Sequence, residues 1–377
     1  MCESLVKVVF CNDPTSFGAL VDPPEENNPS KADEHNLPGN QLLESFRMIG
    51  DDEDVCRAIK AYETAAASLP EDDPKLGRFL NDIAVGYETC HKRSEMLDDL
   101  EKAISTRQKL VAITAEGDAD FACRLSNLGS LFLQHFKCTG DLQDISDGIR
   151  HQQRAVQLTP EGHPDLPGWL NNLGMSFSCR FEHGEDVRDI SEAIQHQQRA
   201  VQLTAEGHAD LPRWLHNLGC SFWDRFVCSG NMQDILEAIR HQQHAVQLTP
   251  EGHADLPGRL NNLGNSYLCC FERTGNMQDI SEAILHQQHT VKLTPEGDVH
   301  LPGRLNNLGS SLLHHFEYTG DIQSISEAIQ HQQHAVQLTP NGNANLQKRL
   351  NNLGASFSRR FEYTGDMQDI SEAIRCQ

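Results

Sequence analysis

The fold is decided by residues 256–295, LPGRLNNLGNSYLCCFERTGNMQDISEAILHQQHTVKLTP. Leu260, Leu263, Gly264, Tyr267 and Phe271 follow the spacing i, i+3, i+4, i+7 and i+11, which places them on one face of a helix. This pattern predicts a first helix, called helix A, in this part of the chain.

Polar residues, proline and glycine mark where the helices begin and end. Asp255 is the expected N-cap of helix A, and Pro257 stands in the first turn, where a missing N–H costs nothing. Gly275 is expected to end helix A, because glycine readily adopts the left-handed conformation of a C-cap. A second helix, helix B, follows through Ile280, Ala283, Ile284, Thr290 and Val291 and is expected to open with a capping box formed by Asp279 and Glu282. The segment that follows helix B, PEGDVHLP here and PEGHADLP one copy earlier, cannot continue a helix and leads to the next helix A.

The unit recurs every 45 residues. The glycine of the NNLG motif returns at Gly129, Gly174, Gly219, Gly264, Gly309 and Gly354, and the Ala-Ile pair returns in phase with it at Ile59, Ile104, Ile149, Ile194, Ile239, Ile284, Ile329 and Ile374. Two anchors in phase mean one helical hairpin copied without insertions, so that neighbouring copies stack and share a core. The predicted fold class is therefore an all-α superhelical solenoid of helical hairpins.

Two repeated positions predict how the hairpins pack. A phenylalanine near the end of helix A returns at Phe46, Phe136, Phe181, Phe226, Phe271, Phe316 and Phe361, and burial of each stabilises the fold by roughly 1.5–3 kcal/mol. A glycine in mid-helix costs about 1 kcal/mol relative to alanine. Its recurrence indicates a close approach of two helix backbones at that point.

Composition narrows the class of partner. The formal net charge of −23 argues against nucleic acid, since no basic stripe is available to meet a phosphate backbone. No apolar run is long enough for a membrane span, and the first ten residues do not form a signal peptide. The 12 cysteines show no CxxC spacing, which favours reduced thiols in a cytoplasmic protein. The sequence leaves the oligomeric state open.

The repeated residues resemble the tetratricopeptide repeat (TPR). The pattern of a large apolar residue, Leu-Gly, an aromatic, alanines and proline is met in one unit by Leu260, Leu263, Gly264, Tyr267, Ala283, Gln287, Thr290 and Pro295. The copies are longer than the 34-residue TPR consensus and are similar to kinesin light chain repeats, and more so to arrays that precede a caspase-like CHAT domain in fungal and bacterial proteins. The resemblance covers roughly residues 38–377 and implies a scaffold that binds a peptide or partner domain, with no cofactor. The alternative that it implies is the sensor arm of a CHAT-type peptidase whose catalytic domain is absent from this chain.

Helix B departs from the TPR pattern at one core position, which is usually aromatic. Here it is glutamine, at Gln152, Gln197, Gln242, Gln287 and Gln332. A buried amide needs hydrogen-bond partners, so these side chains are expected either to bond one another across units or to reach the rim of the groove.

No residue pattern predicts catalysis or a metal site. A catalytic residue should occur once in a repeat protein, whereas every conspicuous residue here is repeated. The HQQH motif places two histidines one turn apart, as in His241 and His244, but zinc needs three or four convergent ligands, and earlier copies carry Arg154 and Arg199 instead. We therefore expect structural or solvent-facing histidines, no metal and no enzymatic activity.

The candidate binding site is a column of asparagines on helix A. At 100° per residue, Asn262 points away from the core face of its helix, toward the side that lines the concave groove of TPR superhelices. The column comprises Asn127, Asn172, Asn217, Asn262, Asn307 and Asn352. Amides in such a column could hold the backbone of an extended peptide, or they could bond neighbouring helices and only maintain the stacking. Basic residues near the expected groove edge, Arg180, Arg225, Arg360, His135 and His315, would favour an acidic ligand.

The two ends of the chain differ from the repeats. Residues 1–37 lack periodicity and are acidic and rich in proline, which predicts disorder. Residues 38–377 are expected to form about eight units, the first with a short helix A and the last cut within helix B. The sequence therefore suggests a fragment or a truncated product.

Overall fold

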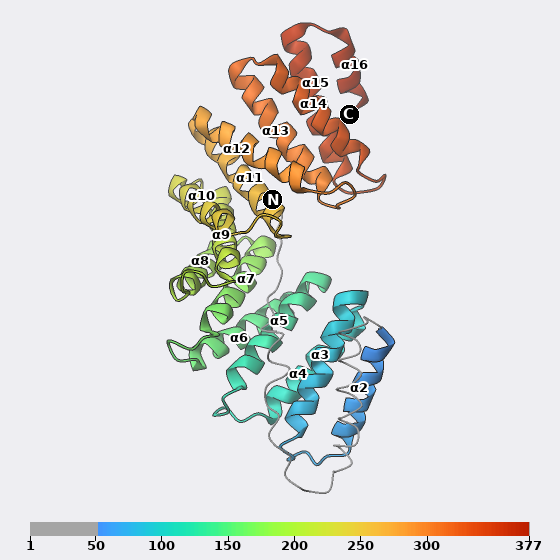
Figure 1. Cartoon of the computed structure of the whole chain (residues 1–377), viewed down its shortest axis with the longest axis vertical. Helices are drawn as coiled ribbons and strands as arrows, with labels where there is room; N and C mark the ends of the chain where they lie inside the picture. The colour runs from blue at the N-terminus through green and yellow to red at the C-terminus, as the bar shows by residue number, and fades with distance from the viewer. Residues whose placement is uncertain (1–51, 377) are drawn as a thin grey trace. The chain divides into compact units, whose positions relative to one another are not determined.

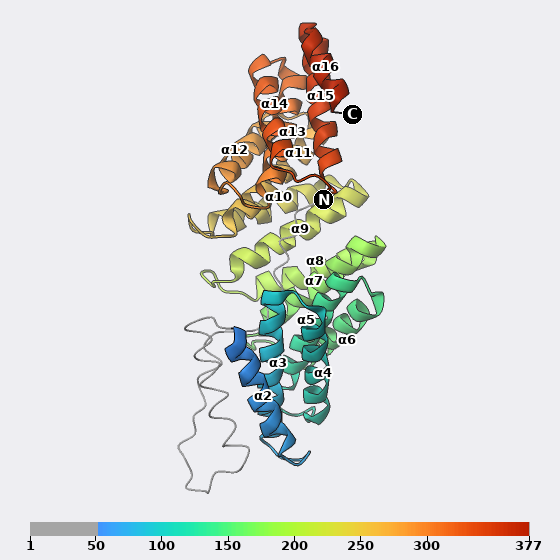
Figure 2. The ribbon, with the colours of Figure 1, turned by 90° about the vertical axis from the view of Figure 1, so that its right-hand side faces the viewer.

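The computed structural model describes residues 52–376, and every regular element in this range is an α-helix (Figures 1 and 2). The helices are α2 (Asp52–Ala67), α3 (Leu76–Ser94), α4 (Leu97–Ile113), α5 (Phe121–Thr139), α6 (Leu142–Leu158), α7 (Leu166–Gly184), α8 (Val187–Gln202), α9 (Leu211–Ser229), α10 (Met232–Gln247), α11 (Leu256–Thr274), α12 (Met277–Leu293), α13 (Leu301–Thr319), α14 (Ile322–Gln337), α15 (Leu346–Thr364) and α16 (Met367–Arg375). The all-α fold of helical hairpins is confirmed.

The described residues fall into two compact units, 52–203 and 204–376, which we call the N-terminal and the C-terminal unit. In the N-terminal unit α2 packs on α3, and the hairpins α3/α4, α5/α6 and α7/α8 follow in series. The C-terminal unit is built from the hairpins α9/α10, α11/α12, α13/α14 and α15/α16. Within each unit, helix B of one hairpin packs on helix A of the next, as a solenoid requires.

Helix A ends as the sequence predicts. In α11 the C-cap is Gly275, with φ 67°, and its N–H donates to the carbonyl oxygen of Phe271 at 2.7 Å. The other end is less regular, because Asp255 is the N-cap residue but its side chain makes no capping hydrogen bond. The carboxylate of Asp255 lies instead 3.5 Å from Arg259, one turn into the helix.

The predicted start of helix B is wrong by one turn. Helix α12 begins at Met277, and the side chain of Asn276 accepts a hydrogen bond of 3.1 Å from the backbone N–H of Gln278. Asp279 therefore lies inside the first turn and does not cap the helix. The carboxylate of Glu282 accepts instead from the side chain of Gln278, at 2.7 Å.

The core of each hairpin contains the two repeated residues that the sequence singles out. Phe136, Phe181, Phe226, Phe271 and Phe316 are buried, and Phe361 in the last hairpin is half-buried. At Gly264 an added Cβ would lie 2.7 Å from Cγ of Gln287 and 3.2 Å from the carbonyl oxygen of Ala283. The predicted close approach is thus confirmed, and it joins helices A and B of one hairpin.

Within the C-terminal unit, the contacts indicate which helices lie on the inner side of the stack. Helix α9 contacts α11, α11 contacts α13, and α13 contacts α15, whereas α10, α12, α14 and α16 make no contact with one another. A row of helices that touch is more closely spaced than a row that does not. The C-terminal unit therefore curves with its A helices inside.

Some predictions lie outside the described residues. These are the disorder of residues 1–37, the short first helix A after Pro38, and the burial of Phe46. The boundaries 1–37 and 38–377 stay predictions. In the part of the chain that is described, no helix has the length and apolar character needed to cross a membrane.

Candidate functional site

The asparagine column differs in exposure from one hairpin to the next. Asn172 and Asn262 are buried, with 2% and 0% of their surface exposed. The remaining four are half-buried: Asn127, Asn217, Asn307 and Asn352. Only these four have side-chain surface that a ligand can reach in this conformation.

In the C-terminal unit the asparagines join successive A helices. Nδ2 of Asn307 donates to Oδ1 of Asn261 at 3.1 Å, and Nδ2 of Asn352 donates to Oδ1 of Asn306 at 3.0 Å. The two asparagines of the NNLG motif therefore have different roles. The carbonyl oxygen of the first accepts a hydrogen bond from the amide N–H of the second asparagine in the following hairpin. This is the stacking role that the sequence left as one of two alternatives.

The junction between α9 and α11 breaks this rule. His216 stands where α11 and α13 carry Asn261 and Asn306, and its Nε2 lies 3.3 Å from Nδ2 of Asn262. The Sγ of Cys220 lies 3.6 Å from the same ring nitrogen. His216 is buried, and its Nδ1 has no hydrogen-bond partner.

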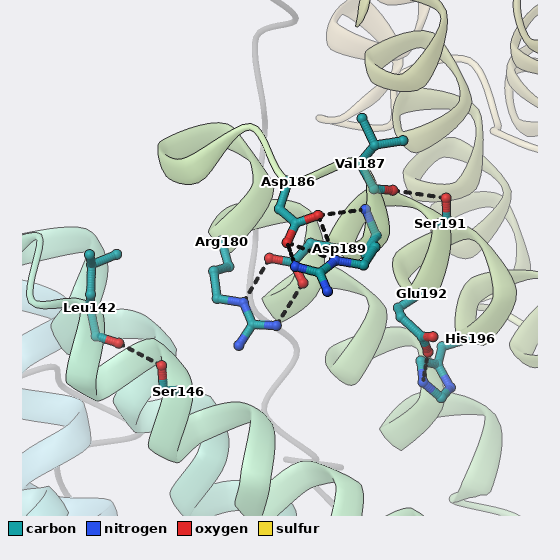
Figure 3. A network of polar contacts seen from close by, with 10 residues as sticks. Leu142, Ser146, Arg180, Asp186, Val187, Asp189, Ser191, Glu192 and His196 are labelled. Carbon is teal, nitrogen blue, oxygen red and sulfur yellow. Dashed lines mark hydrogen bonds and ion pairs between the residues drawn. The ribbon is translucent and has the colours of Figure 1, made fainter. Parts of the chain in front are cut away.

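The basic residues at the predicted groove edge do not offer free charge. Arg180 donates from Nε and Nη2 to both carboxylate oxygens of Asp189, at 2.8 and 2.6 Å (Figure 3). Two other hairpins repeat this two-pronged pair, Arg225 with Asp234 and Arg360 with Asp369. The pairing raises the pKa of Arg180 and Arg360. These pairs neutralise the arginines within the A–B turn of their own hairpins, which weakens the expected preference for an acidic ligand, and that preference stays a prediction.

The two histidines at this position are also engaged within their hairpins. Nδ1 of His135 lies 2.6 Å from Oδ2 of Asp144, and Nδ1 of His315 lies 2.9 Å from Oγ of Ser324. In both contacts the partner lies nine residues after the histidine, which is the sequence separation of the arginine pairs. A side chain at this position therefore links the end of helix A to the first turn of helix B.

The repeated glutamines lie in the core and follow neither predicted arrangement. All five are at most 1% exposed, and their aliphatic carbons pack against the glycine of helix A. Nε2 of Gln287 donates to Oδ1 of Asn265 at 3.0 Å, whereas both amide atoms of Gln152, Gln242 and Gln332 have no partner. The close approach of the two helices therefore leaves most of these amides buried and unsatisfied.

In two of the HQQH motifs the first histidine stacks on the aromatic ring of helix A in its own hairpin, whereas His331 faces no such ring because Leu312 stands at the aromatic position. His241 lies parallel to Phe222, with ring centroids 5.7 Å apart, and His286 lies parallel to Tyr267 at 5.8 Å. Burial lowers the pKa of His241 to about 4 and also lowers that of His286. These side chains pack as neutral aromatic groups, in keeping with the structural role expected for them. Within residues 52–376, no group of three or more His, Cys, Asp or Glu side chains is placed to hold a metal ion.

Sequence reasoning missed a bond that links consecutive hairpins. The guanidinium of Arg304 in α13 donates from Nη1 to Oγ1 of Thr294 at the end of α12, at 2.7 Å. The same bond joins Arg124 to Thr114, Arg259 to Thr249 and Arg349 to Thr339. The recurring ten-residue spacing between threonine and arginine was the available signal.

A buried ion pair in the N-terminal unit was missed as well. Arg107 of α4 donates from Nε and Nη2 to Oε1 of Glu88 in α3, at 2.9 and 2.8 Å, and both side chains are 2% exposed. The repeat pattern does not predict this pair, because the position of Arg107 is occupied by glutamine in the later hairpins, beginning with Gln152.

The comparisons with solved structures find helical-repeat proteins. A putative kinesin light chain with nearly identical TPR-like repeats from Podosopora anserina is 13% identical, with 56% of this chain and 99% of that chain covered and a TM-score of 0.40. A tetratricopeptide repeat protein from Parabacteroides merdae is 12% identical, with 85% and 99% covered and a TM-score of 0.49. The human IFIT1 dimer with PPP-AAAA is 12% identical, with 89% and 77% covered and a TM-score of 0.38. No protein-family model and no curated protein matches the sequence. The chain is thus similar to TPR-like repeat proteins, and at these identities and TM-scores we draw nothing from them about its ligand.

Proposed function

We propose that this protein is an interaction scaffold that holds an extended peptide segment of a partner protein along its A helices. The observation that carries the proposal is the row of half-buried asparagines, Asn127, Asn217, Asn307 and Asn352, at intervals of 45 or 90 residues. In the C-terminal unit three of them lie on A helices that form the inner side of the stack. An inner face with accessible amides on α9, α13 and α15 suits a ligand that crosses several hairpins.

Asparagine is suited to this task because its amide offers two N–H groups and one carbonyl oxygen. The bond from Asn307 to Asn261 uses one N–H of the amide and fixes the side chain in place. A side chain that is already oriented loses little entropy when it binds a peptide carbonyl or N–H. Contacts of this kind hold a peptide backbone and do not select its side chains.

The partner that we propose is a protein and not nucleic acid, since a chain with net charge −23 repels a phosphate backbone. Catalysis and a cofactor are not part of the proposal, nor is a metal ion. Placement in the cytoplasm remains a prediction. So does the alternative role as the sensor arm of a CHAT-type peptidase, in which the chemistry would belong to residues other than those of this chain.

The test is a peptide-library screen against the full chain, followed by titration of the best peptide. We expect the combined variant Asn307→Ala and Asn352→Ala to bind at least about tenfold more weakly, which corresponds to about 1.4 kcal/mol. Asn351→Ala is the matched control, because Asn351 is an exposed amide next to Asn352 that bonds only to Gln347 of its own helix. Equal affinity of the double variant and the wild type, at unchanged melting temperature, would reject the asparagine column as the binding site.

A further inference from the structure

A second surface stands out at the turns between helices A and B. The first residue of helix B is apolar in all seven hairpins from α3/α4 to α15/α16: Leu97, Leu142, Val187, Met232, Met277, Ile322 and Met367. The residue type varies while the apolar character persists, and the residue that follows is polar in all seven copies. Five of the seven are exposed, including Ile322 at 40% and Met367 at 69%. The hairpin does not bury them, so its stability does not account for their character.

Two tyrosines extend this apolar surface in the C-terminal unit. Tyr318 stands edge-on to Phe271 of the preceding hairpin, with ring centroids 5.7 Å apart, and Tyr363 stands in the same way against Phe316 at 5.4 Å. Each hydroxyl end lies over the C-cap glycine of the preceding hairpin, Gly275 or Gly320. Each tyrosine therefore reaches across from its own turn to the turn before it.

Together Tyr318, Ile322, Tyr363 and Met367 form what we call the turn strip. Tyr363 lies against Gly320, two residues before Ile322, so the residues of the two turns adjoin. Both tyrosines are 61% exposed in spite of their contacts with phenylalanine. The fold does not require tyrosine there, because other hairpins place His183 or Arg273 against the same phenylalanine.

Carboxylates border the turn strip. Glu317 and Asp321 flank the first turn, FEYTGDIQ (316–323), and Glu362 and Asp366 flank the second, FEYTGDMQ (361–368). One arginine, Arg359, pairs with both Glu317 and Glu362, at 2.9 Å in each case. Arg360 is occupied by Asp369. Four carboxylates thus face one shared arginine and His314, whose Nδ1 lies 3.4 Å from Glu317, so acidic groups outnumber basic ones along the border of the strip.

We propose that the turn strip binds a segment of a partner protein in which arginine or lysine alternates with apolar residues. Apolar side chains of such a segment would cover Ile322 and Met367, and its cations would lie over the tyrosine rings and beside the carboxylates. A second copy of this chain is a poor occupant, because two acidic borders would face each other. The proposal does not depend on the asparagine column, because Asn307 and Asn352 lie eleven residues before Tyr318 and Tyr363, about three helical turns away.

The test uses the full chain and a fluorescent peptide of alternating arginine and leucine, followed by anisotropy at pH 8. We expect saturable binding that weakens with added salt, and no binding of the matching glutamate–leucine peptide. The strip variant combines Tyr318→His, Tyr363→His, Ile322→Gln and Met367→Gln, and should bind at least about tenfold more weakly. Histidine is chosen because the fold accepts it at this position: His183 of α7 occupies the place of the tyrosine and packs against Phe136 of α5.

The controls separate the strip from general attraction to an acidic protein and from the asparagine column. Leu285→Gln removes an apolar side chain that is 58% exposed on α12 outside the strip, and should not change affinity. Asn307→Ala with Asn352→Ala should also leave binding of this peptide unchanged. If the strip variant binds as tightly as the wild type, or if only the asparagine variant loses binding, the proposal is overturned. If the fourfold variant is misfolded by circular dichroism, Ile322→Gln with Met367→Gln decides instead, since a loss of binding supports the strip and wild-type affinity rejects it.

Discussion

The side-chain amide of Gln287 donates a hydrogen bond to Oδ1 of Asn265, across one hairpin, while the amide of Gln242 in the preceding hairpin bonds to nothing. Both glutamines are fully buried against a glycine of helix A. The difference comes from one residue, because Asn265 has Cys220 as its counterpart in the hairpin of Gln242. Two chemically identical side chains in equivalent places therefore make opposite contributions to stability.

Replacement of each glutamine by methionine should separate these contributions. Gln242→Met removes a buried amide without a partner and keeps its volume, so we expect a gain of about 1 kcal/mol and a higher melting temperature. Gln287→Met breaks a bond and strands the carbonyl oxygen of Asn265, so the melting temperature should fall. Thermal unfolding followed by circular dichroism measures both, and a lower melting temperature for Gln242→Met would contradict the structure.

Glu185 offers a second test, at the C-cap of α7. It has φ 51°, in the left-handed region, where the hairpins at Gly140, Gly230, Gly275, Gly320 and Gly365 carry glycine. Because Glu185 is exposed and an L side chain is strained there, Glu185→Gly should stabilise the chain by about 0.5–1 kcal/mol. Glu182→Gly serves as the control, since the same exchange inside helix α7 should destabilise it. Urea unfolding would show opposite shifts of the midpoint, and a loss of stability with Glu185→Gly would speak against strain at this cap.

The sequence predicts which residues pack inside one hairpin, because the 45-residue period repeats them in every copy. Leu263, Gly264 and Phe271 lie on one helical face, and a face that returns in each copy has to be the packed one. The direction of Asn262 away from that face was also derived from the 100° rule. That the preceding A helix covers this side chain, with Nε2 of His216 3.3 Å from its Nδ2, depends on how closely two hairpins stack, which helical periodicity does not contain.

The remaining errors have a similar origin. In the segment NMQD, both Asn276 and Asp279 are good N-cap residues, and the backbone conformation at Asn276 decides between them. The pairing of Arg180 with Asp189 joins residues on two helices across a turn, so the periodicity of neither helix predicts it. The sequence predicts a free charge at the edge of a groove, whereas the partner of that charge, Asp189, stands nine residues further along the chain.

That pairing gives a third prediction, with its control in the same turn (Figure 3). Arg180→Ala leaves the carboxylate of Asp189, which is largely buried, without its partner, and should destabilise the chain by about 2 kcal/mol. Arg188→Ala breaks the pair with Asp186, which is exposed, and should change stability little, because solvent screens such a pair. Urea unfolding of the two variants tests this. Equal midpoints would mean that Asp189 does not need its arginine.

Acid should weaken the fold through the stacked histidines. The pKa of His241 is lowered from its ordinary value of 6.5 to about 4, chiefly by burial and then by Arg240, whose Nη2 lies 3.0 Å from the ring, while Glu237 at 3.6 Å acts in the opposite direction and His244 adds to the lowering. The unfolded chain therefore binds a proton that the folded chain does not bind between these two pH values, and stability is lost as the pH falls from about 6.5 to 4. For His241 alone the loss amounts to at most about 3 kcal/mol.

The variant His241→Leu isolates this effect, because it keeps an apolar contact with Phe222 and cannot be protonated. We expect its melting temperature to fall less steeply between pH 6.5 and pH 4 than that of the wild type. Three other stacked histidines, His151, His196 and His286, also have lowered pKa values, as does His331, so the melting temperature of the variant still falls in part as the pH is lowered. Asp82 acts in the opposite sense, since burial raises its pKa to about 6 and its proton stabilises the fold on acidification. The difference between the two melting curves is therefore the quantity to compare, and parallel curves would show that His241 is already protonated in the folded chain or stays neutral in the unfolded one.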